Sequence, residues 1–402
     1  MRIKIWGARG STSTPERRNS RYGGNTSCIE VRLDNGTLIV LDCGTGLRPL
    51  GNSLHREFGE RPILGFIFLT HFHWDHIQGI PFFQPLYRAG NLFWFHSAGR
   101  AGLDTKAAIE GQMSNPYFPV KMDAMPAVHH FFDLGCGTIN VNEATITSRP
   151  LYHPQGCVGY RIQADGSTFV YATDTEPGSP DHDRSVRDLA QGADILVYDA
   201  QYTPEQLLSE KKGRGHSSWL EGTRIALECS VKHLLLYHHD PDSNDGYIDH
   251  LVARARRHFA AASGAAEGMR IHLSGGAIRW ANEGLAEDRR REHRVRIETP
   301  VHIRWRDNGG RQFETQGLTR DLSKSGIYFM APADVNTQQT LELIVELPEQ
   351  IIPVVGFEVR YVAKSVRREN LNGILGFAGT AVGVAARFLT APHEAERGGL
   401  AV

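Results

Sequence analysis

One short segment of this 402-residue chain concentrates groups that bind metal ions. The segment is His71-Phe72-His73-Trp74-Asp75-His76. It directly follows an apolar run that is too short for a helix and is typical of a buried strand. As the chain turns, the first two histidines can reach one ion, and the aspartate and last histidine can reach a second. Imidazole combined with carboxylate suits Zn, Mn or Fe.

Two metal ions need more ligands than this segment offers. The further candidates are His153, Asp174, His238 and His239. Each follows an apolar, strand-like run, and the carboxylate of Asp174 could bridge two ions. Taken singly, each is more often a surface or hydrogen-bonded residue than a ligand. Taken together, they stand at the carboxyl ends of predicted strands, where the sites of α/β proteins gather.

The elements that must position these groups alternate between short β-rich runs and helix-like segments up to about residue 283. Strands are predicted at 3–6, 29–33, 38–41, 66–69, 160–163, 168–172, 195–198 and 234–237, and helices near 182–191, 218–230 and 245–262. Asp34-Asn35-Gly36 and residues 164–167 indicate hairpin turns, and Ser217 or Ser218 is a candidate helix N-cap. This mixture predicts an α/β (α+β) domain in which helices cover sheets.

The pattern changes after Trp280. Residues 289–296 include five arginines, and the chain beyond them is rich in strands with few helical signals. Strands are predicted at 301–306, 312–317, 327–330, 340–346, 357–363 and 384–388. About 100 such residues suffice for a small closed barrel. We therefore expect a first domain at 1–284 and a second, all-β domain at 285–392.

The composition excludes several classes of protein. Lys+Arg 44 against Asp+Glu 45 gives a net charge of -1, a poor footprint for gripping long nucleic acid. No apolar run approaches the ~20 residues of a membrane span, and the amino-terminal segment lacks the apolar region of a signal peptide. The five cysteines are scattered and never spaced CxxC, which indicates reduced thiols in a cytoplasmic protein.

The order Asp42, HxHxDH at 71–76, His153, Asp174 and His238 resembles the metallo-β-lactamase superfamily over residues 1 to about 280. The resemblance implies an αββα sandwich with two divalent ions, Zn²⁺ above all, with Mn²⁺ or Fe²⁺ as alternatives. It implies the following assignment: His71, His73 and His153 on one ion, Asp75, His76 and His238 on the other, Asp174 bridging, and Asp42 orienting the ligand loop. The last ligand is either His238 or His239, and its place at the strand end favours His238.

Other short segments resemble the phosphodiesterase branch of that superfamily, which includes transfer-RNA 3′ processing enzymes and cyclic-nucleotide phosphodiesterases. These segments are Gly215-His216-Ser217, Trp6 to Ser11, Gly23 to Cys28, and His238 to Pro241. The resemblance implies that Asp75 activates the nucleophile and that His216 binds phosphate or protonates the leaving group, whereas a lone histidine before a helix is more often a cap. Arg9 and Asn25 either contact substrate phosphate or form turns.

Two motifs open the second domain: RxxxR, in which Arg290, Arg291 and Arg294 stand, and DxSxxG, which contributes Asp321, Ser323 and Gly326. Each motif alone is weak, because basic linkers and turns are common. Together they resemble a PilZ domain over about 288–390, which implies binding of the bacterial messenger cyclic di-GMP. The arginines would fork onto phosphate or guanine edges, Asp321 and Ser323 would accept guanine N–H groups, and Gly326 would allow close approach.

We therefore expect a bacterial, binuclear metal-dependent phosphodiesterase that hydrolyses a small cyclic nucleotide such as cyclic AMP. Cyclic di-GMP would be its allosteric effector, and neither long nucleic acid nor membrane would be a partner. A non-enzymatic cyclic di-GMP receptor is the alternative from another class, and a lactonase or thioesterase of the same fold is the third. The exact substrate, the native metal, the sign of regulation and the oligomeric state, a homodimer included, stay open.

Overall fold

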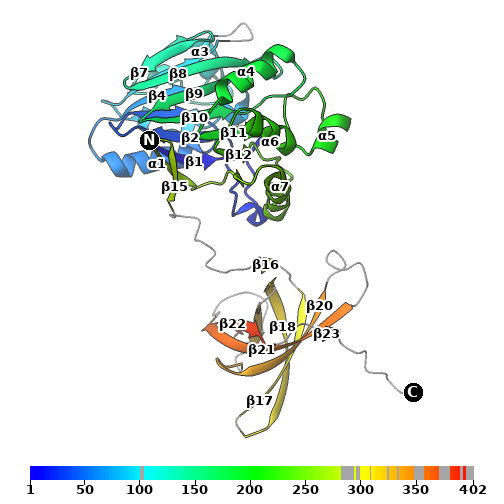
Figure 1. Ribbon diagram of the computed structural model, residues 1–402. Helices are drawn as coiled ribbons and strands as arrows, with labels where there is room; N and C mark the ends of the chain where they lie inside the picture. Colours follow the sequence, from blue (N-terminus) through cyan, green and yellow to red (C-terminus); the bar gives the residue numbers. More distant parts are fainter. Residues whose placement is uncertain are drawn as a thin grey trace. The chain divides into compact units, whose positions relative to one another are not determined.

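The computed structural model of the protein describes residues 1–99, 104–281, 294–295, 299–307, 309–323, 326–332, 335–347, 357–370, 381–389 and 393–394. The chain divides into two compact units, Met1–Glu287 and Asp288–Val402, which are described separately below (Figure 1). Among the helices of the described ranges, none combines the length and apolar character needed to cross a membrane.

The first unit is built on two mixed sheets. The strands of the first sheet are β1 (Arg2–Gly7), β2 (Cys28–Arg32), β3 (Leu38–Leu41), β4 (Leu64–Phe68), β5 (Leu92–Ser97), β6 (Val128–Asp133), β14 (Arg270–Ser274) and β15 (Ala277–Ala281). They lie in the order β15-β14-β1-β2-β3-β4-β5-β6, and β3 to β6 are parallel to one another. The predicted strand at 38–41 and the hairpin that precedes it are confirmed.

The strands of the second sheet are β7 (Thr138–Val141), β8 (Ala144–Leu151), β9 (Cys157–Ala164), β10 (Ser167–Ala172), β11 (Ile195–Asp199), β12 (His233–Tyr237) and β13 (Ala262–Gly264). They lie in the order β13-β12-β11-β10-β9-β8-β7, and β10 to β13 run parallel. Asp165 and Gly166 have φ of 53° and 65°, which is the left-handed pair that a two-residue hairpin needs.

Helices cover the outer faces of both sheets. The helices of this unit are α1 (Leu47–Phe58), α2 (Trp74–Ile77), α3 (Thr105–Gln112), α4 (Pro180–Ala190), α5 (Pro204–Ser209), α6 (Trp219–Glu228) and α7 (Asp245–His258), with short 3-10 turns η1 (Arg17–Asn19), η2 (Ile80–Phe82), η3 (Gln84–Tyr87) and η4 (Met122–Ala124). One apolar cluster lies between the sheets, a second joins α4, α6 and α7 to the second sheet, and a third joins α1 to the first. These layers form the predicted αββα sandwich.

The predicted helix at 245–262 was too long. The helix α7 ends at His258, because Phe259 has extended backbone angles, and the chain then enters the short strand β13. The predicted start of the helix near 218 is confirmed, since the side chain of Ser218 caps α6 by accepting the N–H of Glu221. Sequence reasoning did not find α1, whose apolar face has helical spacing.

The second unit contains a small closed antiparallel barrel. Its strands are β16 (Arg294–Val295), β17 (Pro300–Arg306), β18 (Gln312–Ser323), β19 (Gly326–Pro332), β20 (Thr340–Leu347), β21 (Phe357–Asn370), β22 (Ala381–Phe388) and β23 (His393–Glu394). Six strands follow in the order β18-β17-β20-β21-β22-β19, and pairing of β18 with β19 closes the circuit. Alternate residues such as Val301 and Ile303 point inwards and are fully buried.

Candidate metal centre

Four strand ends bring the predicted ligands together. The HxHxDH segment follows β4 of the first sheet, whereas His153, Asp174 and His238 follow β8, β10 and β12 of the second. The one-turn helix α2 then buries Asp75 and His76. Because the two sheets face each other, ligands from both layers converge at one edge of the sandwich.

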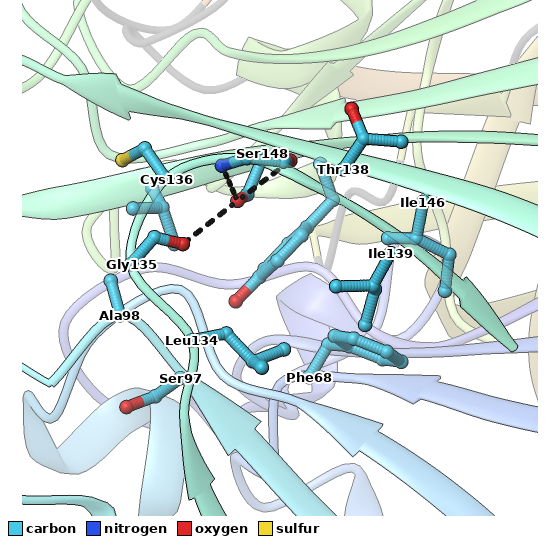
Figure 2. Close-up of a pocket in the computed structure, with 13 residues that line it drawn as sticks. Phe68, Ser97, Ala98, Leu134, Gly135, Cys136, Thr138, Ile139, Ile146 and Ser148 are labelled. Atoms are coloured by element: carbon cyan, nitrogen blue, oxygen red, sulfur yellow. Dashed lines mark hydrogen bonds between the residues drawn. The ribbon is translucent and has the colours of Figure 1, made fainter.

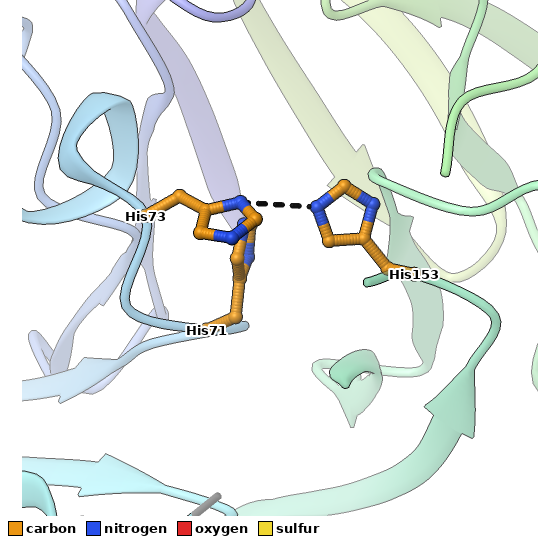
Figure 3. Close-up of side chains that lie close together, drawn as sticks. All are labelled: His71, His73 and His153. Carbon is orange, nitrogen blue, oxygen red and sulfur yellow. Dashed lines mark hydrogen bonds between the residues drawn. The ribbon is translucent and has the colours of Figure 1, made fainter. Parts of the chain in front are cut away.

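Three histidines form the first group. His71, His73 and His153 each offer a nitrogen within 4.8 Å of the others (Figure 3). His73 Nδ1 lies 3.1 Å from His153 Nε2, and the imidazole of His73 is the partly exposed member of the three. Three imidazoles at this spacing match a half-site for a transition metal.

A second group comprises Asp75, His76 and His238, whose ligand atoms also lie within 4.8 Å of one another. The carboxylate of Asp174 contacts both groups. Its Oδ1 lies 3.9 Å from His71 Nε2 and 3.3 Å from His238 Nε2. Two half-sites that share one carboxylate form a buried His/Asp cluster that fits a binuclear metal centre.

The outward nitrogens of three imidazoles are held by neighbours, which fixes the rings. His153 Nδ1 hydrogen-bonds with the carbonyl of Gly215 at 2.8 Å, and His76 Nδ1 with the Asp42 carboxylate at 2.8 Å. His71 Nδ1 lies 3.0 Å from the hydroxyl of Thr70. Metal-binding histidines are commonly oriented in this way.

The second ring nitrogen, Nε2, of two of these histidines tests whether a metal ion fits the site. His71 Nε2 and His76 Nε2 are buried, and neither has a hydrogen-bond partner among the described residues. Buried nitrogens without partners are unfavourable in a folded protein. A cation between these nitrogens and the carboxylates would satisfy them, so the residues present fit the group.

Burial and charge act on these groups in opposite directions. Burial lowers the pKa of His153 to about 4 and that of His71 well below its ordinary value. For His238, burial also acts downwards, but the carboxylates of Asp174 and Asp75 outweigh it and raise the pKa to about 9. Burial would raise the pKa of Asp174, but the neighbouring histidines hold it well below its usual range, so it is an anion.

The backbone turns sharply where β3, β10 and β12 meet the centre. Asp42, Asp174 and His238 have φ of 58°, 56° and 58°, in the left-handed region. This conformation is uncommon outside glycine, and asparagine, aspartate and histidine tolerate it best. Such strain is typical of functional sites.

Asp42 organises the centre from behind. Besides His76, its carboxylate accepts hydrogen bonds from the N–H of Thr70 at 2.8 Å and from the hydroxyl of Tyr171 at 2.8 Å. Asp42 is fully buried and belongs to none of the described metal-capable groups. These contacts agree with an orienting role.

The structure brings His216 to the same centre and adds a residue that sequence reasoning missed. His216 Nδ1 lies 2.9 Å from Asp199 Oδ2 and 3.9 Å from Asp174 Oδ1. Asp199 ends the buried strand β11, so the signal that identified Asp174 could also have identified Asp199. These residues form another metal-capable group with His238.

Gly215 explains why a glycine precedes His216. Its φ is 81°, and a Cβ built there would lie 2.2 Å from His153 Nδ1. Any larger residue would displace the histidine that the Gly215 carbonyl holds. The Gly-His-Ser segment is therefore shaped by contact with the metal-capable cluster.

Three other sequence candidates lie outside the cluster. The Nε2 of His239 hydrogen-bonds with the carbonyl of Ala265 at 2.9 Å, which leaves His238 as the histidine of the cluster. Arg9 is buried and donates to the Gly23 carbonyl at 2.8 Å, so it supports loops. The side chain of Asn25 donates to Glu267 at 2.9 Å.

In the barrel, the two PilZ-like motifs come together. Arg290 and Arg291 lie outside the described residues, but β16 pairs with β18 so that Arg294 is opposite Ser323. Of the DxSxxG motif, Asp321 and Ser323 lie at the end of β18 and Gly326 begins β19. A Cβ on Gly326 would lie 2.5 Å from the Ala386 carbonyl, so close strand packing also requires this glycine.

A separate cavity of about 230 Å³ lies near β5 to β9, and Figure 2 shows its lining. Its walls include Phe68, Leu134, Ile146, Val158 and Tyr160. None of the residues that line it is a predicted ligand, so it is distinct from the His/Asp cluster.

Comparison with known proteins gives the family. Residues 37–239 match the beta-lactamase superfamily domain, and residues 288–391 match the PilZ domain. The chain is 24% identical to ribonuclease Z of Haloarcula marismortui over 292 residues, covering 59% of this chain and 86% of that protein. It is also 24% identical to ribonuclease BN of Escherichia coli over 297 residues, covering 59% and 90%.

Among solved structures, the metallo-beta-lactamase fold protein YhfI from Bacillus subtilis superposes with a TM-score of 0.50 at 19% identity. The match covers 67% of this chain and 97% of that one, and it shows the fold. The αββα layers, the converging His/Asp cluster and the family matches agree, and we conclude that the chain is a member of the metallo-β-lactamase superfamily that carries a PilZ domain after its sandwich.

Proposed function

We propose that the first unit is a binuclear metal-dependent phosphodiesterase and that its preferred substrate is a small cyclic nucleotide such as cyclic AMP. The observation that carries this proposal is the Asp174 carboxylate between two half-sites, with His216 beside it. Similarity to ribonucleases supports phosphodiester chemistry. The net charge of -1 favours a small substrate over long RNA.

The cluster would hold two ions, one at His71, His73 and His153 and one at Asp75, His76 and His238, with Asp174 shared. Ions bound there would supply Lewis-acid chemistry, lowering the pKa of water and offsetting negative charge on phosphoryl oxygens. The carboxylate of Asp75 is fixed in orientation, because its Oδ2 accepts a hydrogen bond from the N–H of Ser11 at 2.8 Å.

The chain's own groups would manage the protons. Histidines lower the pKa of Asp75 despite its burial, so it is ionised and can accept a proton or a hydrogen bond from the attacking water. Asp199 holds the Nδ1 side of His216, which leaves Nε2 to donate to a phosphate oxygen or to the departing alkoxide. Each step therefore has a named acceptor or donor.

We propose further that the PilZ domain binds cyclic di-GMP and thereby regulates hydrolysis. The pairing of Arg294 with Ser323 supports this, because residues opposite each other on antiparallel strands lie about 5 Å apart. Both motifs can then act on one ligand. Arg290, Arg291, Asp321 and Gly326 complete the proposed site.

A turnover panel tests the proposal. Metal-loaded protein is offered cyclic AMP, cyclic GMP, bis(p-nitrophenyl) phosphate, a short RNA, an acyl-homoserine lactone and nitrocefin, each with and without cyclic di-GMP. We expect hydrolysis of the cyclic nucleotides and of the activated diester. Hydrolysis of the lactone alone would replace the proposal with a lactonase, and no turnover with tight cyclic di-GMP binding would favour a receptor.

A further inference from the structure

Trp74 is an anomaly beside the metal centre. It stands within HxHxDH, yet 73% of its surface is exposed, whereas its neighbour Asp75 is buried. Exposure of a large aromatic ring forgoes the favourable transfer of apolar surface from water. Within the described ranges, Trp74 makes no ring or cation contact and joins no apolar cluster. Packing in the first unit therefore gives no reason for this ring.

Its position relative to the centre is set by the chain. Consecutive Cα atoms are about 3.8 Å apart, so Trp74 begins one residue from each of two ligand candidates, His73 and Asp75. His73 is the partly exposed member of the histidine group. An exposed indole therefore adjoins, in the chain, the member of the histidine group that solvent reaches.

A second exposed ring flanks the same histidines. Tyr152 immediately precedes His153, is 45% exposed, and leans on the ring of His182 at 5.5 Å. His153 in turn lies 3.1 Å from His73. Trp74 and Tyr152 are therefore each one residue from a pair of touching imidazoles.

From this arrangement, and resting on the phosphodiesterase function proposed above, we propose that Trp74 stacks on the nucleobase of the substrate, with Tyr152 as a weaker second contact. Every base has a π face, so stacking on an aromatic side chain favours nucleosides without selecting among bases. The substrate class is then phosphodiesters of planar heterocyclic nucleosides, with broad base preference.

The test compares two substrates with the same leaving group, thymidine 5′-(p-nitrophenyl phosphate) and methyl p-nitrophenyl phosphate. We expect Trp74→Ala to lose about 5- to 100-fold in kcat/KM on the nucleoside ester and to stay within about twofold of wild type on the methyl ester. Trp74→Phe should retain most activity, whereas Trp74→Leu, which is apolar but lacks a π face, should resemble the alanine variant. Leu64→Ala, exposed at the opposite end of β4, is the matched control.

Equal losses on both esters, or no loss on either, would overturn stacking; the first result would point to a role in shaping the ligand turn. Metal content and circular dichroism of each variant check that turn. If the wild type hydrolyses neither ester, the phosphodiesterase function fails separately. Calorimetry with thymidine 5′-monophosphate and methyl phosphate then decides: weaker nucleotide binding by Trp74→Ala alone supports stacking, and unchanged binding refutes it.

Discussion

His216 and Asp199 form a buried pair, with Nδ1 of the imidazole 2.9 Å from Oδ2 of the carboxylate. The same carboxylate accepts backbone N–H groups from Ser217 at 3.0 Å and Asp174 at 3.1 Å. Asp199 is thus anchored to a neighbour of His216 and to the bridging aspartate. A shift of His216 or Asp199 would therefore be transmitted to Asp174 in the metal centre.

We predict that His216→Ala lowers turnover by ~10²–10⁴ without loss of metal, the range expected when a proton donor is removed. An activated p-nitrophenyl ester should be affected less than cyclic AMP, because its leaving group needs no proton. Steady-state kinetics and metal analysis measure both effects. Equal losses on the two substrates would show that His216 binds substrate or supports structure instead.

Asp199→Asn should reproduce part of this loss, because an amide holds the Nδ1 side of the His216 ring less firmly than a carboxylate does. The double variant should be no slower than His216→Ala alone, since groups that act as a unit are not additive. The three variants are compared on the same pair of leaving groups. Additive losses would mean that Asp199 acts through another route, such as its 3.8 Å contact with His238.

We expect Asp174→Asn and Asp174→Ala to lose at least one of two bound ions together with activity. Asparagine tolerates the left-handed backbone of this position, whereas alanine adds about 1–2 kcal/mol of strain. Metal analysis reads the first effect and denaturant unfolding the second. Full activity of either variant in chelator would sink the binuclear assignment.

A histidine away from the centre gives a clear pH dependence. Burial lowers the pKa of His96 to about 4, and its ring is stacked between Phe68 and Phe132. In the unfolded chain it titrates near 6.5, so the folded state binds fewer protons between pH 6.5 and 4. The contribution of the neutral His96 ring to the free energy of unfolding is fully present above pH 6.5 and is lost as the pH falls towards 4.

We therefore predict that His96→Phe flattens the fall in the free energy of unfolding over this window, by up to about 3 kcal/mol at pH 4. Urea unfolding at half-unit steps of pH measures it. His55→Phe, on the surface helix α1, is the matched control and should leave the slope unchanged. The same slope in His96→Phe and wild type would contradict the prediction.

Cyclic di-GMP should change kcat/KM for the phosphodiester through a coupling of ~1–3 kcal/mol, and an increase is the expected sign. Arg290 and Arg294 closely follow the division between the two units in the sequence, so we expect ligand binding there to be coupled to the first unit. Arg290→Ala and Arg294→Ala should abolish both binding and the response and leave basal activity near wild type. Arg304→Ala, on β17 in contact with Glu314, is the barrel control.

Reciprocity gives a second measurement of this coupling. A non-hydrolysable substrate analogue must shift the affinity for cyclic di-GMP by the same factor that cyclic di-GMP shifts the affinity for the analogue. Deletion of residues 286–402 should remove the response. Tight binding in calorimetry with unchanged kinetics at all substrate levels would refute regulation and favour a docking role for the barrel.

The sequence predicted elements well where the signal is local. A continuous apolar run such as Leu38–Leu41 can hardly be anything but a buried strand, and the structure agrees. The predicted end of α7 was wrong because residues 259–262 contain no helix-breaking residue. Only the pairing with β12 makes Ala262 part of a strand. Such boundaries are decided by tertiary contacts.

The residues of the candidate site also divide into those with a local sequence signal and those that only tertiary contacts reveal. HxHxDH could be identified because its ligands are close in sequence, and His153 and Asp174 because each directly follows an apolar, strand-like run. Asp199 carries the same strand-end signal as Asp174, but only the structure shows its partner, because His216 stands seventeen positions away in the sequence. The pairing of Arg294 with Ser323 was also out of reach, because a two-residue strand such as β16 has no periodicity to detect.

The ligand groups also join distant parts of one chain. The first group spans His71 to His153, and the second spans Asp75 to His238, about twice as many residues. Closing a loop of twice the length costs only about 0.6 kcal/mol more in chain entropy. All five cysteines are free, so none provides a covalent cross-link. Ions at this seam would take the place that disulfides hold in other small domains, as reversible cross-links between two layers.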